Sequence, residues 1–436
     1  MKRKNIFKEL ILEFQHQKVP EIIDRDINIP INTGKIISVI GVRRSGKTYI
    51  LFQIIKKLIK DIPIEKIIYI NFEDERLDIK SQELNLILEA YMELFPNNSL
   101  NNVYFFFDEI QNINGWEKFV RRLYDRYSKN IYITGSNSKL LSKEISTALR
   151  GRTISYEVFP LSFKEFLKFK NYSFKENEIY IPQKKALMKS LFNQYLNFGG
   201  FPEVVLQEDE TIKIKILQEY FDVMLYKDLV ERYKIKNIPV LKYFIKRTIE
   251  NVGKPLSVNN IYNEIKSQGY KVSKDSLYEF LEMLESIYLI FTVRKFSKSV
   301  LKTELSQKKV YLIDNGFLNA LSFSFKENKG ALLENLTAKE FKTYEGEIFY
   351  FKEKKECDFI TVIKSKFIPV QVSYVLKNKK TLKREIDGLL EAMKYLNARN
   401  GYIITYDEED QLNIENKTIQ IIPAYKFIFK SQNSLK

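Results

Sequence analysis

Residues 41–48 read Gly-Val-Arg-Arg-Ser-Gly-Lys-Thr, a glycine-containing turn with apolar sequence on both sides. The β-branched run at 36–40 predicts a buried parallel strand, and the apolar spacing of residues 49–58 predicts a helix packed against it. The turn therefore lies where a strand becomes a helix. Strands and helices go on alternating to about residue 158, which predicts a doubly wound α/β sheet.

The turn completes the phosphate-loop pattern G-x-x-x-x-G-K-[ST], which predicts a nucleotide site. Backbone N–H groups and the positive end of the helix dipole would hold the β-phosphate, and glycine leaves room where a side chain would collide with it. We expect Lys47 to reach the β- and γ-phosphates of ATP and Thr48 to ligate Mg²⁺. A chance surface turn is the alternative. The predicted cofactor-binding residues of the loop are Gly41, Val42, Arg43, Arg44, Ser45, Gly46, Lys47 and Thr48.

A second buried strand ends in two carboxylates. The aromatic run 103–107 is followed by Asp108 and Glu109, the arrangement called Walker B. We expect Asp108 to hold Mg²⁺ through water, which makes it both a cofactor-binding and a metal-binding residue. We expect Glu109 to polarise the attacking water, because phosphoryl transfer needs mainly positioning and charge stabilisation. An acidic turn after a core strand is the alternative, and the phosphate loop upstream argues against it.

A third strand, predicted over residues 130–134, ends in a short polar segment. Because the tips of parallel strands share one edge of a sheet, Ser136 and Asn137 in this segment should face the same crevice as Lys47. Asn137 is the predicted sensor group, which would contact the γ-phosphate or orient the water. A helix cap before the next helical segment is almost as good an interpretation.

Two arginines, Arg150 and Arg152, end the helical segment that follows. An arginine from a neighbouring subunit can neutralise charge in the transition state, so both are candidates for an arginine finger in a homo-oligomer. Binding to nucleic acid, or plain solvation, is the alternative for either side chain.

Ordered motifs extend along nearly the whole chain, at residues 41–48, 72–74, 108–111 with 116–117, 134–137, 149–152, 160–166, 198–203, 226–229 and 311–316. In these motifs the chain resembles the archaeal and bacterial P-loop ATPases of the AAA+ class that pair an ATPase module with a C-terminal nuclease-like domain. The resemblance implies ATP binding and hydrolysis. It says little about purpose, because the biological task of that family is mostly unassigned.

Composition is consistent with a globular protein of several domains. A chain of 436 residues with 44% hydrophobic residues has enough apolar side chains for two or three packed cores. No apolar run approaches the ~18 residues of a membrane helix, and the N-terminus does not read as a signal peptide. We therefore expect a cytoplasmic protein with no membrane partner. The single Cys357 and single His16 exclude an intramolecular disulfide and a zinc cluster.

The net charge of +16 indicates a polyanionic partner. Basic chains gain affinity for nucleic acid by releasing counterions from its phosphates. We expect nucleic acid, with DNA favoured over RNA, while a protein partner or a merely solvated surface are the alternatives. The basic residues that crowd into one C-terminal stretch are Lys352, Lys354, Lys355, Lys364, Lys366, Lys377, Lys379, Lys380, Lys383 and Arg384.

Four segments are predicted along the chain. Residues 1–158 form the P-loop ATPase core, and residues 159–235 form a helical lid over the nucleotide. Residues 236–327 resemble a winged helix, whose second helix could enter a major groove or, through its acidic side chains, contact a protein. The order of elements in residues 328–436 resembles the restriction-endonuclease-like fold.

Nuclease activity is not expected of that last segment. Its signature is an acidic residue followed on the next strand by Glu-x-Lys or Gln-x-Lys, because carboxylates hold Mg²⁺ and the lysine activates water. Asp358 matches the first position and Gln371 is tolerable at the second, but Ser373 stands where the lysine belongs. A hydroxyl cannot replace an ammonium near the scissile phosphate, unless another lysine substitutes.

The sequence thus predicts a Mg²⁺-dependent ATPase of the AAA+ class that couples hydrolysis to a nucleic-acid-bound assembly. Two alternatives stay open: a nucleotide-gated switch that binds a protein, and a nuclease regulated by ATP.

Overall fold

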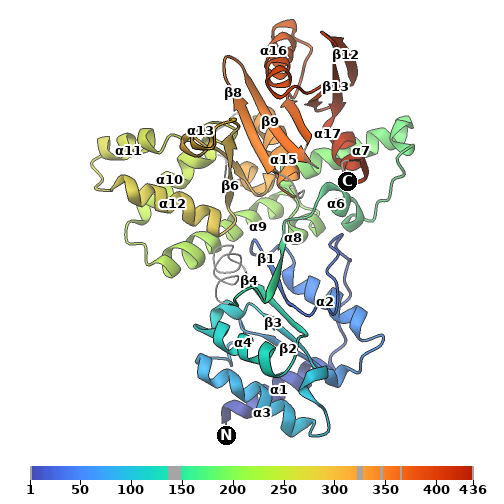
Figure 1. Cartoon of the computed structure of the whole chain (residues 1–436), viewed down its shortest axis with the longest axis vertical. Helices are drawn as coiled ribbons and strands as arrows, with labels where there is room; N and C mark the ends of the chain where they lie inside the picture. Colours follow the sequence, from blue (N-terminus) through green and yellow to red (C-terminus); the bar gives the residue numbers. More distant parts are fainter. Residues whose placement is uncertain (1, 136–148, 322–327, 344–346, 364–365, 435–436) are drawn as a thin grey trace. The chain divides into compact units, whose positions relative to one another are not determined.

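The structure, a computed structural model, describes residues 2–135, 149–321, 328–343, 347–363 and 366–434 (Figure 1). The chain divides into two compact units, Met1–Phe159 and Pro160–Lys436. In Figure 1 the first unit runs from blue to teal and the second from green to red. None of the helices in the described ranges is long and apolar enough to cross a membrane.

The first unit is built on a five-stranded sheet with the strand order β2-β3-β4-β1-β5. Every pairing in it is parallel, so the predicted parallel α/β sheet is confirmed. The carboxyl ends of the strands therefore share one edge. The strands are β1 (Ile36–Gly41), β2 (Ile67–Asn71), β3 (Tyr104–Asp108), β4 (Ile131–Gly135) and β5 (Thr153–Val158).

Helices cover both faces of this sheet because its strands are apolar on both faces. Successive side chains of a strand point to opposite faces; accordingly Phe105 and Phe107 pack in one core and Phe106 in the other. The first core includes Phe7 of α1, and the second includes Ile54 of α2. The helices are α1 (Lys2–His16), α2 (Lys47–Leu58), α3 (Asn85–Leu94) and α4 (Trp116–Arg126).

The second unit begins with helices. α6 (Phe163–Phe169), α7 (Pro182–Phe198), α8 (Pro202–Leu206) and α9 (Glu210–Val223) lead into a π-helical stretch, Met224–Glu231. α7 packs on α14 (Asn315–Ala320) and α15 (Lys329–Thr343), and α6 on α17 (Ala424–Ser434). The segment expected to be a lid therefore packs within the second unit, and its action on the nucleotide stays a prediction.

The turn at the end of α7 is a helix stop. Gly199 has φ +74, and a Cβ on it would lie 1.6 Å from a carboxylate oxygen of Asp314. Asp314 accepts a 2.8 Å hydrogen bond from the N–H of Gly200. Only glycine fits this close approach of backbone and carboxylate.

The winged-helix-like segment contains the expected pair of helices and strand. Ser257 and Ser273 cap α11 (Val258–Ser267) and α12 (Lys274–Ser286) by accepting hydrogen bonds from backbone N–H groups. α10 (Ile238–Glu250) packs on both. The strands β6 (Ile290–Lys295) and β7 (Lys309–Leu312) follow, separated by the short helix α13 (Val300–Leu305). Winged-helix function stays a prediction.

The second sheet has eight strands in the order β12-β13-β11-β10-β9-β8-β6-β7. β6 pairs with β8, so the β6–β7 hairpin joins the sheet of the last predicted segment and brings Lys309 of β7 into it. The remaining elements are β8 (Glu347–Lys352), β9 (Glu356–Ile363), β10 (Lys366–Val372), α16 (Lys379–Leu396), β11 (Asn400–Thr405), β12 (Asp410–Ile414) and β13 (Lys417–Pro423).

Candidate functional site

The predicted phosphate loop connects β1 to α2. Gly46, the residue before α2, has φ +94, and Arg44 has φ +67. Backbone with such left-handed residues forms concavities in which successive N–H groups gather around an anion. Gly41 serves a different purpose from the one expected, because a Cβ there would lie 2.1 Å from the carbonyl oxygen of Val158 on β5. Glycine at this position permits close strand packing.

Lys47 begins α2 and is almost fully buried. Its ammonium donates to the carbonyl oxygen of Val42 at 3.2 Å and lies 3.5 Å from Oε1 of Glu109. The loop also holds a buried polar atom, Oγ of Ser45, which has no hydrogen-bond partner among the described residues. A cationic group and an unsatisfied hydroxyl in one loop fit the phosphates of a nucleotide.

Asp108, at the tip of β3, collects hydroxyl groups from three elements. Its Oδ2 accepts hydrogen bonds from the hydroxyls of Thr48 at 2.7 Å and Tyr69 at 2.9 Å. Its Oδ1 accepts a hydrogen bond from the hydroxyl of Thr134. Burial raises the pKa of Asp108, and the hydrogen bonds from Thr134, Thr48 and Tyr69 offset part of that rise. Thr48 and Asp108 thus meet at the tip of β3, and their role as magnesium ligands stays a prediction.

Glu109 follows in a left-handed conformation with φ 49. Its backbone N–H donates a 2.8 Å hydrogen bond to Oγ1 of Thr134, which fixes the turn. Burial by itself would raise the pKa of Glu109, but the Lys47 ammonium and the Gln111 amide outweigh it, so the pKa lies below its ordinary value. The carboxylate is therefore ionised, as a group that polarises water must be.

The donors at this edge fit Mg²⁺. A hydroxyl and a carboxylate are hard oxygen ligands, and Mg²⁺ is usually held by one or two carboxylates together with substrate phosphates rather than by a full protein cage. Throughout the described part of the chain, no group of three or more His, Cys, Asp or Glu side chains could hold a metal ion. A magnesium ion at Thr48 and Asp108 would thus depend on the nucleotide.

Three predicted catalytic residues, Asn137, Arg150 and Arg152, are not among the residues described at this site. Asn137 lies in residues 136–148, outside the described residues. Arg152 lies at the amino ends of the strands, where its carbonyl oxygen accepts a 2.8 Å hydrogen bond from the backbone N–H of Ile36. Lys47 and Asp108, by contrast, lie at the carboxyl ends. Arg152 is also paired with Asp125 at 2.9 Å. Neither it nor the neighbouring, exposed Arg150 reaches the site of its own subunit.

Thr134 and Tyr69 are site residues that the sequence reasoning missed. Both are polar residues at or near the carboxyl end of a buried strand, β4 and β2 respectively. Their position near the strand ends could have identified them from the sequence, because it places their hydroxyls at the edge of the sheet that holds Lys47.

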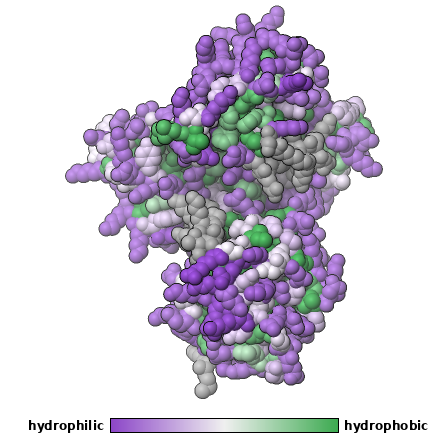
Figure 2. Space-filling model, in the orientation of Figure 1, coloured by the Kyte–Doolittle hydropathy of each residue, from purple (hydrophilic) through white to green (hydrophobic). Residues whose placement is uncertain are grey.

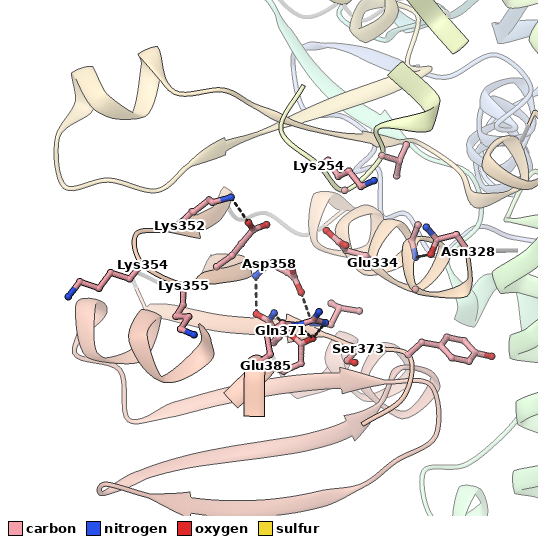
Figure 3. A pocket seen from close by; sticks show the side chains of 18 residues that line it. Lys254, Asn328, Glu334, Lys352, Lys354, Lys355, Asp358, Gln371, Ser373 and Glu385 are labelled. Carbon is pink, nitrogen blue, oxygen red and sulfur yellow. Dashed lines mark hydrogen bonds and ion pairs between the residues drawn. The ribbon is translucent and has the colours of Figure 1, made fainter. Parts of the chain in front are cut away.

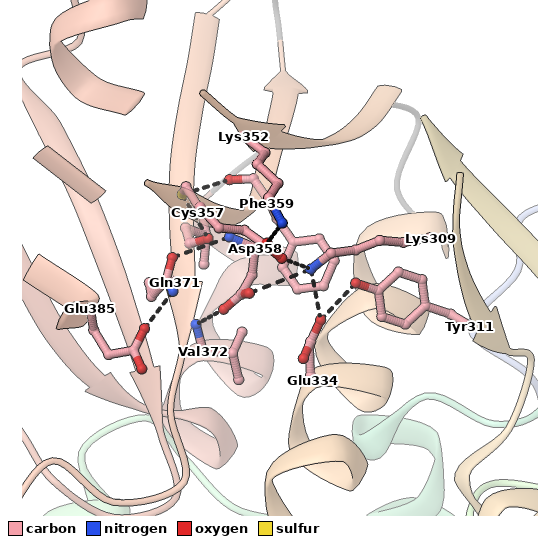
Figure 4. A network of polar contacts seen from close by, with 12 residues as sticks. Lys309, Tyr311, Glu334, Lys352, Cys357, Asp358, Phe359, Gln371, Val372 and Glu385 are labelled. Atoms are coloured by element: carbon pink, nitrogen blue, oxygen red, sulfur yellow. Dashed lines mark hydrogen bonds and ion pairs between the residues drawn. The ribbon is translucent and has the colours of Figure 1, made fainter. Parts of the chain in front are cut away.

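The segment predicted to be nuclease-like, whose fold assignment stays a prediction, has its candidate residues on one face of the sheet. β9 and β10 are antiparallel, with Val370 opposite Phe359, which places Asp358 opposite Gln371. The Gln371 amide is engaged within the protein (Figure 4). Its oxygen accepts a 3.1 Å hydrogen bond from the backbone N–H of Asp358, and its nitrogen donates a hydrogen bond to the carboxylate of Glu385. Ser373 donates to the carbonyl of Val375 at 3.2 Å.

The basic C-terminal stretch lies on the surface. Every residue of it named above is exposed except Lys364, which is outside the described residues. Figure 2 shows hydrophilic atoms over the top of the view, where Figure 1 places α16 and β12.

Comparison with known proteins gives the class first. Residues 33–167 match the family described as "AAA domain", and residues 189–328 match the family described as "Domain of unknown function (DUF8612)". Together with the parallel sheet and the strand–loop–helix unit, the first match makes the first unit a P-loop NTPase of the AAA class.

The relatives give the protein family. The chain is 43% identical over 438 residues to "Uncharacterized protein MJ1544" of Methanocaldococcus jannaschii, covering 98% of this chain and 95% of that protein. An "Uncharacterized protein" of Haemophilus influenzae is 33% identical over 364 residues, covering 82% and 85%. The chain belongs to the family that contains these proteins.

Likeness to solved structures is weak. The structure titled "Structure of Drosophila ORC bound to AT-rich DNA and Cdc6" covers 73% of this chain and 91% of that chain, with 11% identity and a TM-score of 0.18. A score this low supports no conclusion about fold or partners.

Proposed function

We propose that the chain is a Mg²⁺-dependent ATPase that couples hydrolysis to a change in a nucleic-acid-bound assembly. The observation that carries the proposal is that two pairs of side chains, Lys47 with Glu109 and Thr48 with Asp108, lie at the carboxyl edge of the first sheet. The Lys47 ammonium lies 3.5 Å from the Glu109 carboxylate, and the Thr48 hydroxyl donates a 2.7 Å hydrogen bond to Asp108. These are a phosphate-binding cation, an ionised base and two magnesium ligands in one place.

Each group has a distinct task in this proposal. The loop N–H groups and Lys47 bind the β- and γ-phosphates. Thr48 and Asp108 would hold Mg²⁺, which when bound neutralises phosphate charge. Phosphate oxygens compete with Glu109 for the Lys47 ammonium, so nucleotide binding leaves the Glu109 carboxylate available to orient water.

Position supports the proposed water-polarising role of Glu109. Hydrogen bonding to Thr134 and the left-handed turn hold its backbone, while Lys47 and Gln111 hold its carboxylate. A base fixed from both ends loses little entropy when it positions water, and positioning accounts for much of the rate enhancement in phosphoryl transfer.

The charge distribution of the second unit supports a nucleic-acid partner. α16 begins at the Asn378 cap with Lys379 and Lys380, followed by Lys383 and Arg384, and has no acidic residue in its first turn. Positive charge at a helix N-terminus is unfavourable by itself, because the helix dipole is positive there. A bound phosphate would remove this repulsion. We therefore place DNA or RNA, with DNA favoured, at this unit.

The proposal requires a homo-oligomer only if Arg150 or Arg152 acts as an arginine finger. Arg150 and Arg152 lie away from the site of their own subunit, so either could act only on the nucleotide of a neighbouring copy. The ion pair of Arg152 with Asp125 favours Arg150 for that role.

The testing experiment is ATP turnover with Mg²⁺, measured alone and with single-stranded DNA, duplex DNA or RNA, using Lys47→Ala as the inactive control. We expect turnover that requires Mg²⁺ and rises with DNA. Turnover that no nucleic acid changes would favour a nucleotide-gated protein switch. Turnover unaffected by Lys47→Ala would overturn the assignment of the site.

A further inference from the structure

A buried lysine lies among three carboxylates in the second unit (Figure 4). The ammonium of Lys309 is 2.8 Å from Glu356, 3.4 Å from Glu334 and 3.6 Å from Asp358. Lys309 comes from β7, Glu334 from α15, and the other two from β9. Burial alone would lower the pKa of Lys309, but the three carboxylates raise it above its ordinary value, so the ammonium is charged.

A cavity of about 880 Å³ opens beside this cluster (Figure 3). Its wall includes Glu334, Asp358 and Gln371, whereas Lys309 is only 1% exposed and the described part of the wall is formed without it. Basic side chains border the same cavity from separate elements. They are Lys254 before α11, Lys352, Lys354 and Lys355 at the β8–β9 turn, and Arg384 of α16.

We propose that this cavity binds one strand of nucleic acid through its phosphodiester groups without cutting it, and that the Lys309 ammonium occupies the cation position among the carboxylates. The inference deepens the proposed function, because it assigns the nucleic-acid partner to a particular cavity. It adds that binding there needs no divalent metal.

The position of Lys309 accounts for the absence of a metal requirement. A divalent cation among Glu334, Glu356 and Asp358 would have to displace an ammonium that these same carboxylates hold and that the protein encloses. A like charge close by, at reduced dielectric, opposes such binding. This agrees with the finding that, among the described residues, no group of three or more His, Cys, Asp or Glu side chains could hold a metal ion.

The same position argues against cleavage. A lysine that activates water for attack must lie at the substrate, and Lys309 is separated from the cavity by the carboxylates that surround it. Ser373 does border the cavity, but its hydroxyl donates to Val375. The lysine missing at position 373 is therefore not replaced by Lys309.

The shape and charge of the cavity favour a single strand. Its volume is within the range of pockets that enclose a small ligand, roughly 300–1,000 Å³, so it can admit a nucleotide unit but not a duplex. Lys254 and Lys354 are exposed, where they can follow a flexible backbone. Inside, carboxyl oxygens of Asp358 and Glu334 can accept hydrogen bonds from base amino groups or sugar hydroxyls.

The first test measures binding of a fluorescent single-stranded oligonucleotide to the full chain by anisotropy, without ATP and in EDTA. Lys254→Ala combined with Lys354→Ala should weaken binding about tenfold and make the slope of log affinity against log salt shallower by about 1.4, or about 0.7 per lost contact. Lys57→Ala combined with Lys60→Ala, on the exposed surface of the first unit, is the matched control and should leave affinity unchanged. An equal loss in both double variants, or none in either, overturns the proposal.

The second test concerns the cation. Wild-type affinity should be the same in EDTA and in Mn²⁺, and no cleaved product should form. Lys309→Met leaves the carboxylates without their cation, so Mn²⁺ should raise the melting temperature of this variant more than that of the wild type. Cleavage in Mn²⁺ that Asp358→Ala abolishes would overturn the inference. This cleavage assay uses only wild type and Asp358→Ala, so it can be done even if Lys309→Met does not fold.

These outcomes are separate from those for the ATPase. Oligonucleotide binding is measured without nucleotide, and basal ATP turnover is measured without oligonucleotide. Oligonucleotide binding that depends on Lys254 and Lys354, with no ATP turnover, would refute the proposed ATPase and leave the cavity inference standing. ATP turnover together with unaltered oligonucleotide binding in the Lys254/Lys354 double variant would refute the cavity inference and leave the ATPase standing.

Discussion

The backbone N–H of Glu109 donates a 2.8 Å hydrogen bond to the hydroxyl of Thr134. That hydroxyl in turn donates to Asp108. One side chain on β4 therefore holds the carboxylate of Asp108 and the backbone of Glu109. The proposed magnesium ligand and the residue that carries the proposed base are thus positioned by the same atom.

Thr134→Val should reduce kcat about 10- to 100-fold with a small change in KM, because misplacement of a positioned group by about 1 Å costs rate rather than binding. The variant should also lose about 1–3 kcal/mol of unfolding free energy, since a buried N–H is left without its acceptor. Steady-state kinetics and denaturant unfolding measure the two effects.

Thr134→Ser is the matched control, because it keeps the hydroxyl and loses only a methyl group. It should recover most of kcat. If valine and serine behave alike, the hydroxyl has no positioning role.

Lys47→Ala should lower ATP turnover by at least about 100-fold, because a preorganised cation that stabilises transferred charge contributes on this order. A coupled assay for released phosphate measures it. Lys57→Ala, at an exposed position of the same helix, should retain full turnover. Loss of turnover in both variants would mean that damage to α2, rather than loss of the phosphate contact, is responsible.

Glu109→Gln should bind ATP with near-normal affinity yet hydrolyse it about 10²- to 10⁴-fold more slowly, because the amide keeps the shape of the carboxylate but cannot act as a base. Binding of a fluorescent ATP analogue and single-turnover hydrolysis separate the two steps. Glu75→Gln, an exposed glutamate of the same unit, is the control. Loss of nucleotide binding in Glu109→Gln would show that the roles of Asp108 and Glu109 are assigned wrongly.

The sequence was sufficient to predict the parallel sheet and the phosphate loop because both depend on local patterns: apolar runs, a glycine-bounded turn and polar residues at strand ends. The roles of Thr134 and Lys309 depend on which strands are neighbours. β4 lies between β1 and β3, and β7 lies at the end of the second sheet, and neither fact can be read from local spacing.

The same limit applies to Gly41 and Arg152. The glycine is required by the carbonyl of Val158 on a strand far along the chain, and the arginine lies at the amino end of β5, opposite the site. Residues that follow a helical segment can lie at either edge of a sheet, so sequence alone could not show that Arg152 is remote from the nucleotide.

Arg150→Ala should lower turnover without weakening ATP affinity if the residue acts on the nucleotide of a neighbouring subunit. Mixing Arg150→Ala with Lys47→Ala should then restore part of the activity, because in a mixed oligomer some intact sites receive an intact arginine. Arg152→Ala, which breaks the ion pair with Asp125, is the comparison. A fully active monomer, shown by light scattering at assay concentration, would exclude an arginine supplied in trans.

Asp314 should make the stability of the second unit depend on pH. Burial raises its pKa to about 6, although the N–H groups of Gly200 and Gly316 and the charge of Lys339 oppose the rise. In the unfolded chain the pKa is about 3.9, so the folded state holds its proton to higher pH. The stabilising contribution is therefore fully present below about pH 4 and is lost as the pH rises through about 6.

Asp314→Asn removes this titration, because an amide carries no such proton. The unfolding free energy of the wild type minus that of the variant should fall by roughly 3 kcal/mol from about pH 4 to about pH 7, the equivalent of a shift of about two pKa units. Urea unfolding followed by circular dichroism at several pH values measures the difference. Asp222→Asn, at an exposed position on α9, controls for the loss of one carboxylate. Parallel pH profiles for wild type and Asp314→Asn would show that burial at the Gly199–Gly200 turn does not hold a proton on Asp314.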